Sequence, residues 1–449
     1  MQTLIKHVCC AVIVLATMFV SCGGEQGVIE TTGEGNEFDK PILVYFNKDC
    51  DEQHCTPGNT ANSCMNLESK LVKVINMADS TIDFATYEIN LDRIIDALME
   101  RAAQGVAVRL IVDAKDPEDE ENIQRYDLMR DKLESMKKGV DDIAGTADDI
   151  HIFADAPIYE NEEMLCDGER KEDGTAYGSA YTDQMHNKFV VVDNEWVWTG
   201  SWNFTVTGLY GSEEDQEACN LNGNANNSIL LHSTGLAQAY TDEFNEMWGS
   251  DVLVPDPHAS NFHGRKEDNV AHECHIGDDC VEVYMSPGDD ALARVRAALE
   301  TADHEVYFCI FSWSDQQMVD MLKNKWEVDG ELTGFDIRGV FDSSFWNQYW
   351  SASLDMTGRE SPNPDYNNPW TNPAPVYKDR EDRKLHHKYM IIDAHHPDSD
   401  PVVITGSTNW SKNGNEINDE NLLIIHSAEV ANQYLQEFEA RFANAAQVD

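Results

Sequence analysis

One arrangement of six residue types occurs twice in the chain, and it constrains the fold more than any other feature of the sequence. The first copy comprises His186, Lys188, Asp193, Gly200, Ser201 and Asn203. The second copy comprises His386, Lys388, Asp393, Gly406, Ser407 and Asn409. In both, one residue separates His from Lys, and four apolar or aromatic residues separate Lys from Asp. A spacing repeated this closely indicates two related structural units.

The order of apolar segments around each copy repeats as well. In the first half, strand patterns at 41–46, 81–89 and 108–112 alternate with helical patterns near Leu67 and Leu91. In the second half, strand patterns at 281–285, 305–311 and 337–341 alternate with helical patterns near Leu292 and Met318. Each half then reaches its His-Lys copy and closes with an amphipathic helix, at 236–248 or 430–442. This alternation predicts an α/β fold with a mostly parallel sheet in each half.

The length and the changes in composition predict a two-domain organisation. With 449 residues, the chain is too long for one ordinary domain. We expect an export signal at 1–22, a flexible Gly- and Glu-rich tether at 23–38, and domains at 39–250 and 281–449. Scattered Pro, His and charged residues at 251–280 indicate the linker between the domains.

The first residues have the form of a bacterial export signal. A charged start precedes an apolar run from Val8 to Val20, and small residues follow. The end of the run, Val-Ser-Cys-Gly, resembles a lipobox, which would make Cys22 the lipidated residue. A plain secretory signal cleaved nearby is the alternative. Either interpretation predicts an exported bacterial protein, as a membrane lipoprotein or in secreted form.

Eight cysteines follow the signal, and an even number in an exported chain indicates disulfide bonds. Cys309 lies in an apolar strand pattern, where a buried thiol is the alternative. His272, Cys274, His275 and Cys280 lie close together, but their spacing matches no common structural zinc site. We therefore expect a local Cys274–Cys280 disulfide there.

The repeated residues carry a recognisable chemistry. His and Lys two positions apart on a strand point to the same face, whereas the Asp at the end of each copy points to the other. Two copies that meet across a pseudo-twofold interface would bring together two imidazoles, two ammonium groups and two Asn amides. These groups supply a nucleophile, a general acid and a clamp for negative charge, as phosphoryl transfer without a metal ion requires.

The pattern resembles the HxKxxxxD signature of the phospholipase D superfamily, in the form with two motifs on one chain. This resemblance implies two α/β/α repeats packed about a pseudo-twofold axis, an active site at their interface, a covalent phosphohistidine and no cofactor or metal. The catalytic residues that it implies are His186, Lys188, Asn203, His386, Lys388 and Asn409. The residues expected to support or orient the site are Asp193, Ser201, Asp393 and Ser407.

In this family a carboxylate beyond the Gly-Ser-x-Asn segment often holds a motif histidine. Glu420 matches that position in the second half, whereas Asn226 occupies it in the first. We expect Glu420 beside His386, where it favours the imidazolium. His186 is then the neutral nucleophile and His386 the general acid, the order that the resemblance also implies. Any carboxylate for His186 would come from elsewhere, such as the 208–223 loop.

The charge of the chain bears on its substrate. The formal net charge of −50 repels polyanions at long range, which argues against general nucleic-acid binding. Together with the expected membrane anchor, this charge favours a phospholipid substrate. Because both motifs lie on one chain, we expect the protein to act as a monomer. A nuclease is the alternative, because Lys378, Arg380, Arg383 and Lys384 precede the second motif. An inactive binding protein is a further alternative, but both motif histidines and both lysines are present.

Overall fold

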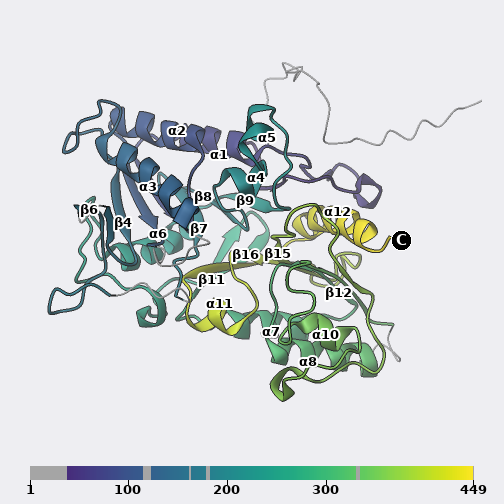
Figure 1. Ribbon diagram of the computed structural model, residues 1–449. Coiled ribbons are helices and arrows are strands. Elements are labelled where there is room, and N and C mark those ends of the chain that lie inside the picture. The colour runs from purple at the N-terminus through teal and green to yellow at the C-terminus, as the bar shows by residue number, and fades with distance from the viewer. Residues whose placement is uncertain (1–37, 115–122, 161–162, 178–182, 330–333, 448–449) are drawn as a thin grey trace, which may run out of the picture.

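The computed structural model describes residues 38–114, 123–160, 163–177, 183–329 and 334–447. The expected signal at 1–22, Cys22 and nearly all of the expected tether therefore lie outside the described residues. Within the described residues, no helix combines the length and the apolar character needed to span a bilayer. The N-terminal half, purple to teal, and the C-terminal half, green to yellow, pack against each other as two α/β units (Figure 1).

A nine-stranded sheet forms the first unit. Its strands are β1 (Ile42–Phe46), β2 (Thr81–Thr86), β3 (Ala107–Val112), β4 (His151–Ala154), β5 (Ile158–Glu160), β6 (Glu163–Gly168), β7 (Lys188–Val192), β8 (Trp196–Gly200) and β9 (Asn227–His232). They are ordered β1-β9-β8-β7-β2-β3-β4-β6-β5. The segment between β3 and β7 thus adds strands β4 to β6 to the sheet, and the apolar pattern did not predict these strands.

An eight-stranded sheet forms the second unit. Its strands are β10 (Glu273–Ile276), β11 (Asp279–Ser286), β12 (Glu305–Ile310), β13 (Asp336–Phe341), β14 (Val376–Lys378), β15 (Lys388–Ile392), β16 (Val402–Gly406) and β17 (Glu420–His426). The order β11-β17-β16-β15-β12-β13-β14 matches β1-β9-β8-β7-β2-β3-β4 of the first sheet strand for strand. The internal repeat and the α/β class expected from the sequence are therefore confirmed.

The expectation of mostly parallel sheets is wrong. The parallel pairs are β2–β3, β3–β4, β4–β6, β12–β13 and β13–β14, and the other neighbours are antiparallel. A turn at 193–195 joins β7 to β8, and a loop at 393–401 joins β15 to β16; neither connection contains a crossover helix, and both pairs are antiparallel. Helical crossovers, which permit parallel pairing, occur earlier in each unit.

Helices form three layers around the two sheets. The outer helices are α1 (Leu67–Ile75), α2 (Asp92–Ala103) and α3 (Ile123–Lys138) on the first sheet, and α7 (Ala291–Thr301), α8 (Gln316–Asn324) and α10 (Ala352–Met356) on the second. The closing helices α6 (Thr234–Trp248) and α12 (Ala428–Ala445) pack between the sheets. Short elements are α4 (Val206–Leu209), α5 (Glu213–Glu217), α11 (Lys412–Glu416), η1 (Glu52–His54), η2 (His263–Arg265), η3 (Lys325–Asp329) and η4 (Pro364–Tyr366).

The motif strands are apolar throughout because both of their faces are buried. In β7, Phe189 and Val191 face the central core that the two units share, whereas Val190 and Val192 face the outer core under α1 and α2. Alternate side chains of a strand point to opposite faces, so each face receives its own apolar set. The motif lysine begins this strand and is itself buried.

The structure contradicts the expected Cys274–Cys280 disulfide, whereas Cys309 is the buried thiol given as the alternative. Cys274 and Cys280 are free thiols on the β10–β11 hairpin, where Cys274 pairs with Val281 and His275 with Cys280. This register turns the two cysteine side chains to opposite faces of the hairpin, so the expected disulfide does not form. Cys309 is a fully buried free thiol. The hairpin also shows that the end of the expected 251–280 linker belongs to the second sheet.

Candidate active site

The two motifs meet where the units touch, and each is supported by the opposite unit. Met185, which precedes the first motif histidine, forms a parallel β-bridge with Asp419, and Leu385 forms the equivalent bridge with Ala225. The backbone N–H groups of His186 and His386 donate to the carbonyl oxygens of Asp419 and Ala225, both at 2.9 Å. The crossed bridges set the two histidines on either side of one interface.

Glu420 is bound to His186, and the expectation that it would lie beside His386 is wrong. The Glu420 Oε2 atom lies 2.8 Å from Nδ1 of His186, and both side chains are buried. The reason is the crossed bridge, because it brings the residue after Asp419 across the interface to the opposite histidine. With a carboxylate at Nδ1, the imidazole keeps its proton there and leaves the Nε2 lone pair for chemistry.

His386 has neutral partners instead. Its Nδ1 lies 2.9 Å from the carbonyl oxygen of Ser201 and 3.1 Å from the Oδ1 of Asn226. Both partners are acceptors, so they too hold the ring proton at Nδ1. Asn226 thus supports His386 as Glu420 supports His186. This equivalence explains why Asn226 and Glu420 align when the two halves of the sequence are compared.

The motif lysines are buried beside the histidines. Lys188 Nζ donates to the carbonyl oxygen of His186 at 2.6 Å, and Lys388 Nζ donates to that of His386 at 3.0 Å. Lys388 Nζ also lies 3.4 Å from Nε2 of His386. An aromatic ring covers each pair, with Tyr87 4.9 Å from the ring centroid of His186 and an equivalent phenylalanine over His386.

The electrostatics of this interface favour an anion. Burial, together with Lys388 and Lys188, holds the pKa of His386 well below its ordinary value, so this imidazole is neutral. Burial and Lys188 also lower the pKa of Lys388. Burial raises the pKa of Glu420 to about 8, although Lys188 opposes that change. A bound phosphate monoanion would relieve the repulsion between the two lysines.

The two motif asparagines are half-buried, and their amide oxygens are buried with spare hydrogen-bonding capacity. Among the described residues, the Oδ1 atoms of Asn203 and Asn409 accept no hydrogen bond. Buried amides without partners are rare in folded proteins and often mark ligand sites. Asn203 also lines a cavity of about 360 Å³ that His386 enters. The amides are therefore placed to bind oxygens of a phosphodiester.

The motif aspartates lie away from this chemistry. Asp193 accepts hydrogen bonds from the backbone N–H groups of Asp79, Ser80 and Thr81, at 2.7 to 2.9 Å. Asp393 accepts equivalent bonds from residues 303–305, at 2.9 to 3.0 Å. Each aspartate fixes the turn after its motif strand to the start of the neighbouring strand.

The motif serines orient the partners of the histidines. Ser201 Oγ lies 3.2 Å from Asn226 Oδ1 and accepts the backbone N–H of Asn227 at 3.1 Å. Ser407 Oγ accepts the backbone N–H of Asn421 at 3.0 Å, and its hydroxyl bonds to Glu420. The serines thereby connect each Gly-Ser-x-Asn segment to the residue that holds the opposite histidine.

Two aspartates of the site were missed in the sequence. Asp113 Oδ1 accepts the N–H of Met185, and Asp342 Oδ2 accepts that of Leu385, both at 2.9 Å. Both aspartates directly follow a buried strand, β3 or β13, at equivalent places in the two halves. Alignment of the halves beyond the motifs would have found them.

The mouth of the cavity carries charges of both signs. Arg383 and Lys384, two of the four basic residues noted in the sequence, line it together with Glu88, Glu381 and Asp382. Lys378 and Arg380 are exposed and are not among the lining residues. In the described part of the chain, three groups of residues have ligand atoms close enough to hold a metal ion, and no motif residue belongs to them.

Comparisons with known proteins agree with this geometry. The family model described as "Cardiolipin synthase, PLD-like domain" matches residues 71–248 and 295–442, and so includes both motifs. Human mitochondrial cardiolipin hydrolase is 28% identical over 157 residues, which are 34% of this chain and 51% of that protein. The chain thus spans about half the length of this relative.

A bacterial relative and a solved structure extend the comparison. Phospholipase D of Rickettsia bellii (strain RML369-C) is 24% identical over 163 residues, 36% of this chain and 69% of that protein. The crystal structure of phosphatidylserine synthase from Haemophilus influenzae Rd KW20 aligns with a TM-score of 0.56 at 10% identity. That alignment covers 91% of this chain and 89% of the other, so the two share a fold.

Proposed function

Since the chain belongs to the PLD-like family described as cardiolipin synthase, PLD-like domain, we propose that it is a phosphodiesterase that works through a phosphohistidine. The observation that carries the proposal is the pair of buried imidazoles, His186 and His386, both held through Nδ1. In each ring Nε2 is therefore the unprotonated nitrogen, the atom that can react with phosphorus or exchange a proton. Two lysines and two asparagine amides beside them bind the phosphoryl oxygens.

The reaction has two balanced steps. First, Nε2 of His186 attacks phosphorus, the bond from phosphorus to the leaving oxygen breaks, and His386 donates a proton to that oxygen. Second, water or an alcohol attacks phosphorus and gives its proton to His386, and the phosphorus–nitrogen bond breaks. The low pKa of His386 suits its role as base in the second step. Binding of the substrate anion raises that pKa and brings in the proton for the first step.

The position of Glu420 favours His186 as the nucleophile. This carboxylate lies at His186 and not at His386, where the sequence predicted it. Phosphorylation of Nε2 leaves a positive charge on the ring, and a carboxylate at Nδ1 stabilises that charge better than a neutral amide does. Glu420 supplies this carboxylate to His186, whereas His386 has Asn226.

We propose phospholipid head groups as the substrate, by hydrolysis or transfer as in a phospholipase D. The named activities of the human and Rickettsia relatives support a phospholipid. The net charge of −50 also disfavours a polyanionic substrate. A nuclease is the second candidate, because Arg383 and Lys384 line the cavity at His386.

The experiment gives the purified protein vesicles of phosphatidylcholine, phosphatidylethanolamine or cardiolipin, and single-stranded DNA, in parallel and with EDTA present. Release of a head group, or formation of phosphatidic acid in the vesicles, supports the lipid proposal. Cleavage of DNA alone would favour the nuclease. The variants His186→Ala and His386→Ala are the controls, and a rate that both retain would belong to a contaminant.

We also propose that Cys22 anchors the protein to a membrane and that the chain acts as a monomer. The lipobox-like sequence supports the anchor, and two motifs on one chain support the monomer. Mass spectrometry of the mature N-terminus tests the first point, since an unmodified terminus downstream of Cys22 would mean plain secretion. Light scattering of the purified protein tests the second.

A further inference from the structure

A group of metal-ligand side chains lies where the N-terminal segment docks on the last helix, outside the catalytic cavity. His54 ends η1, His395 follows β15, and Glu439 lies on α12. One ligand atom from each residue lies within 4.8 Å of the other two. Two imidazoles and a carboxylate form a ligand set that zinc accepts, with a fourth position left to water.

His395 is oriented as a metal-binding histidine would be. Its Nδ1 lies 2.9 Å and 3.0 Å from the two carboxylate oxygens of Glu305, and its backbone N–H donates to the same residue at 2.8 Å. A carboxylate at Nδ1 holds the proton there and leaves Nε2 with a free lone pair. Histidines that bind metal ions usually donate their other ring N–H to such a partner.

The backbone around His54 is fixed to the helix that carries Glu439. The N–H of Asp51 donates to the carbonyl oxygen of Gln436 at 2.8 Å, and Asn432 Nδ2 donates to that of His54 at 2.9 Å. Glu439 lies three positions after Gln436, on the next turn of α12. These hydrogen bonds hold the loop and the helix together, which lowers the entropic cost of binding an ion between them.

The surrounding charge is mixed, with an excess of acid. Glu439 Oε1 accepts a hydrogen bond from Arg338 at 2.9 Å, so the guanidinium competes with a cation for this oxygen. Arg338 also bonds to Asp336, at 3.0 Å. Asp336, Glu305 and Glu439 outnumber this single arginine, and Glu439 retains its second oxygen. The balance attracts a divalent cation, while the arginine limits the affinity.

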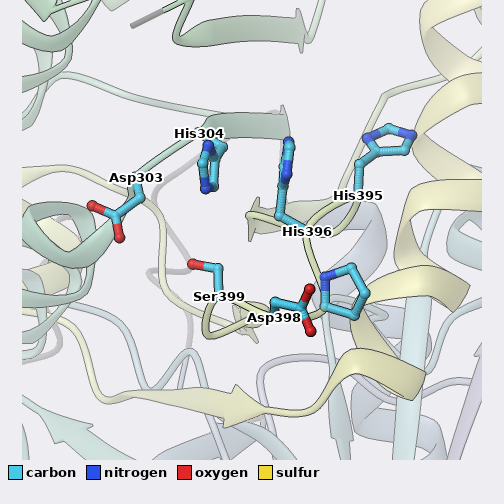
Figure 2. A pocket seen from close by; sticks show the side chains of 7 residues that line it. Asp303, His304, His395, His396, Asp398 and Ser399 are labelled. Carbon is cyan, nitrogen blue, oxygen red and sulfur yellow. The ribbon is translucent and has the colours of Figure 1, made fainter.

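We propose that His54, His395 and Glu439 bind one zinc-class divalent ion, which ties η1 and the loop after β15 to α12. His395 also lines a cavity of about 410 Å³, which contains two further histidines, His304 and His396, whose stacked ring centroids are 3.9 Å apart. Figure 2 shows His395 set apart from this pair. His304 and His396 share this cavity with His395 and therefore serve as matched control positions.

The test uses the full-length chain after removal of metal with EDTA and dialysis. Titration with zinc chloride, followed by calorimetry, should show one ion bound per chain and a rise in Tm. His54→Ala, His395→Ala and Glu439→Gln should each weaken binding by about tenfold or more. His396→Ala should leave the affinity unchanged. Binding that survives His395→Ala, or that His396→Ala abolishes, would overturn the proposal.

Two other groups in the described part of the chain compete for the assignment. One contains Asp268, His272 and Asp289, and the other contains Glu273, His275 and Cys280. His272→Ala and His275→Ala should therefore retain full zinc binding. Loss of zinc binding in either variant would assign the ion to the group that contains the substituted histidine. Cobalt should bind without thiolate-to-cobalt charge-transfer absorption, since the proposed ligands include no sulfur. Appearance of that absorption would assign the ion to Cys280.

Discussion

The imidazole of His263, in the segment between the two units, lies 2.9 Å from the carboxylate of Asp419, the residue before Glu420. A second carboxylate, that of Asp155, lies 3.1 Å from the other ring nitrogen. Lys266 from the same segment lies 3.7 Å from Asp419, and all four side chains are buried. The connecting segment therefore supports the residue whose backbone holds His186.

We predict that His263→Ala lowers the free energy of unfolding by about 3–5 kcal/mol, because it removes the imidazole that pairs with two buried carboxylates. Burial lowers the pKa of His263, but Asp419 and Asp155 together raise it well above 6.5. The stabilisation is thus complete below the unfolded pKa and is lost as the pH rises through the folded one. Urea unfolding of both proteins at several pH values measures this, and a difference that grows with pH would contradict it.

We predict that Glu420→Gln lowers kcat by about 100-fold, because the neutral amide cannot stabilise the positive charge on phosphorylated His186. The pKa of Glu420 near 8 adds a signature. In the unsubstituted protein, kcat/KM should increase with pH as this carboxyl ionises, and the increase should vanish in the variant. Bis(p-nitrophenyl) phosphate is the substrate to use, since its leaving group needs no proton. A pH profile shared by both proteins would remove Glu420 from this role.

We predict that His386→Ala accumulates a phosphoenzyme on His186 with the same substrate. The first step needs no general acid for p-nitrophenolate, whereas the second step lacks its base. Acid-labile label mapped by mass spectrometry should lie on His186, and His186→Ala should remain unlabelled. Label on His386 in the His186→Ala protein would reverse the assignment of nucleophile and acid.

We predict that phosphodiesterase activity survives EDTA, because Lys188 and Lys388 supply the positive charge that a metal ion would otherwise supply. The zinc site proposed above should affect Tm without changing kcat. The measurement is kcat with and without chelator, before and after zinc is restored. Lys388→Met should lower activity by about 100-fold or more under both conditions. Activity that EDTA removes and zinc restores would refute the mechanism.

The sequence predicted the repeat, the α/β class and most strands and helices of each half, because apolar periodicity is a local property of the chain. It failed where the answer depended on contacts between distant segments. Glu420 and His186 are 234 residues apart, and no local pattern indicates that the motif partners are exchanged between the units. The prediction of a Cys274–Cys280 disulfide is wrong for a local reason, because the end of the expected linker forms a hairpin whose register turns the two side chains to opposite faces.

The crossed bridges between the units also limit how the two copies of the motif can change during evolution. Asp419 and Glu420 are encoded in the second half but support His186, while Ala225 and Asn226 support His386 in return. A substitution in one copy is therefore under selection for its effect on the histidine of the other copy. The two copies cannot diverge independently. Expressed as separate polypeptides, the two halves should complement each other in trans, and neither alone would contain a complete histidine site.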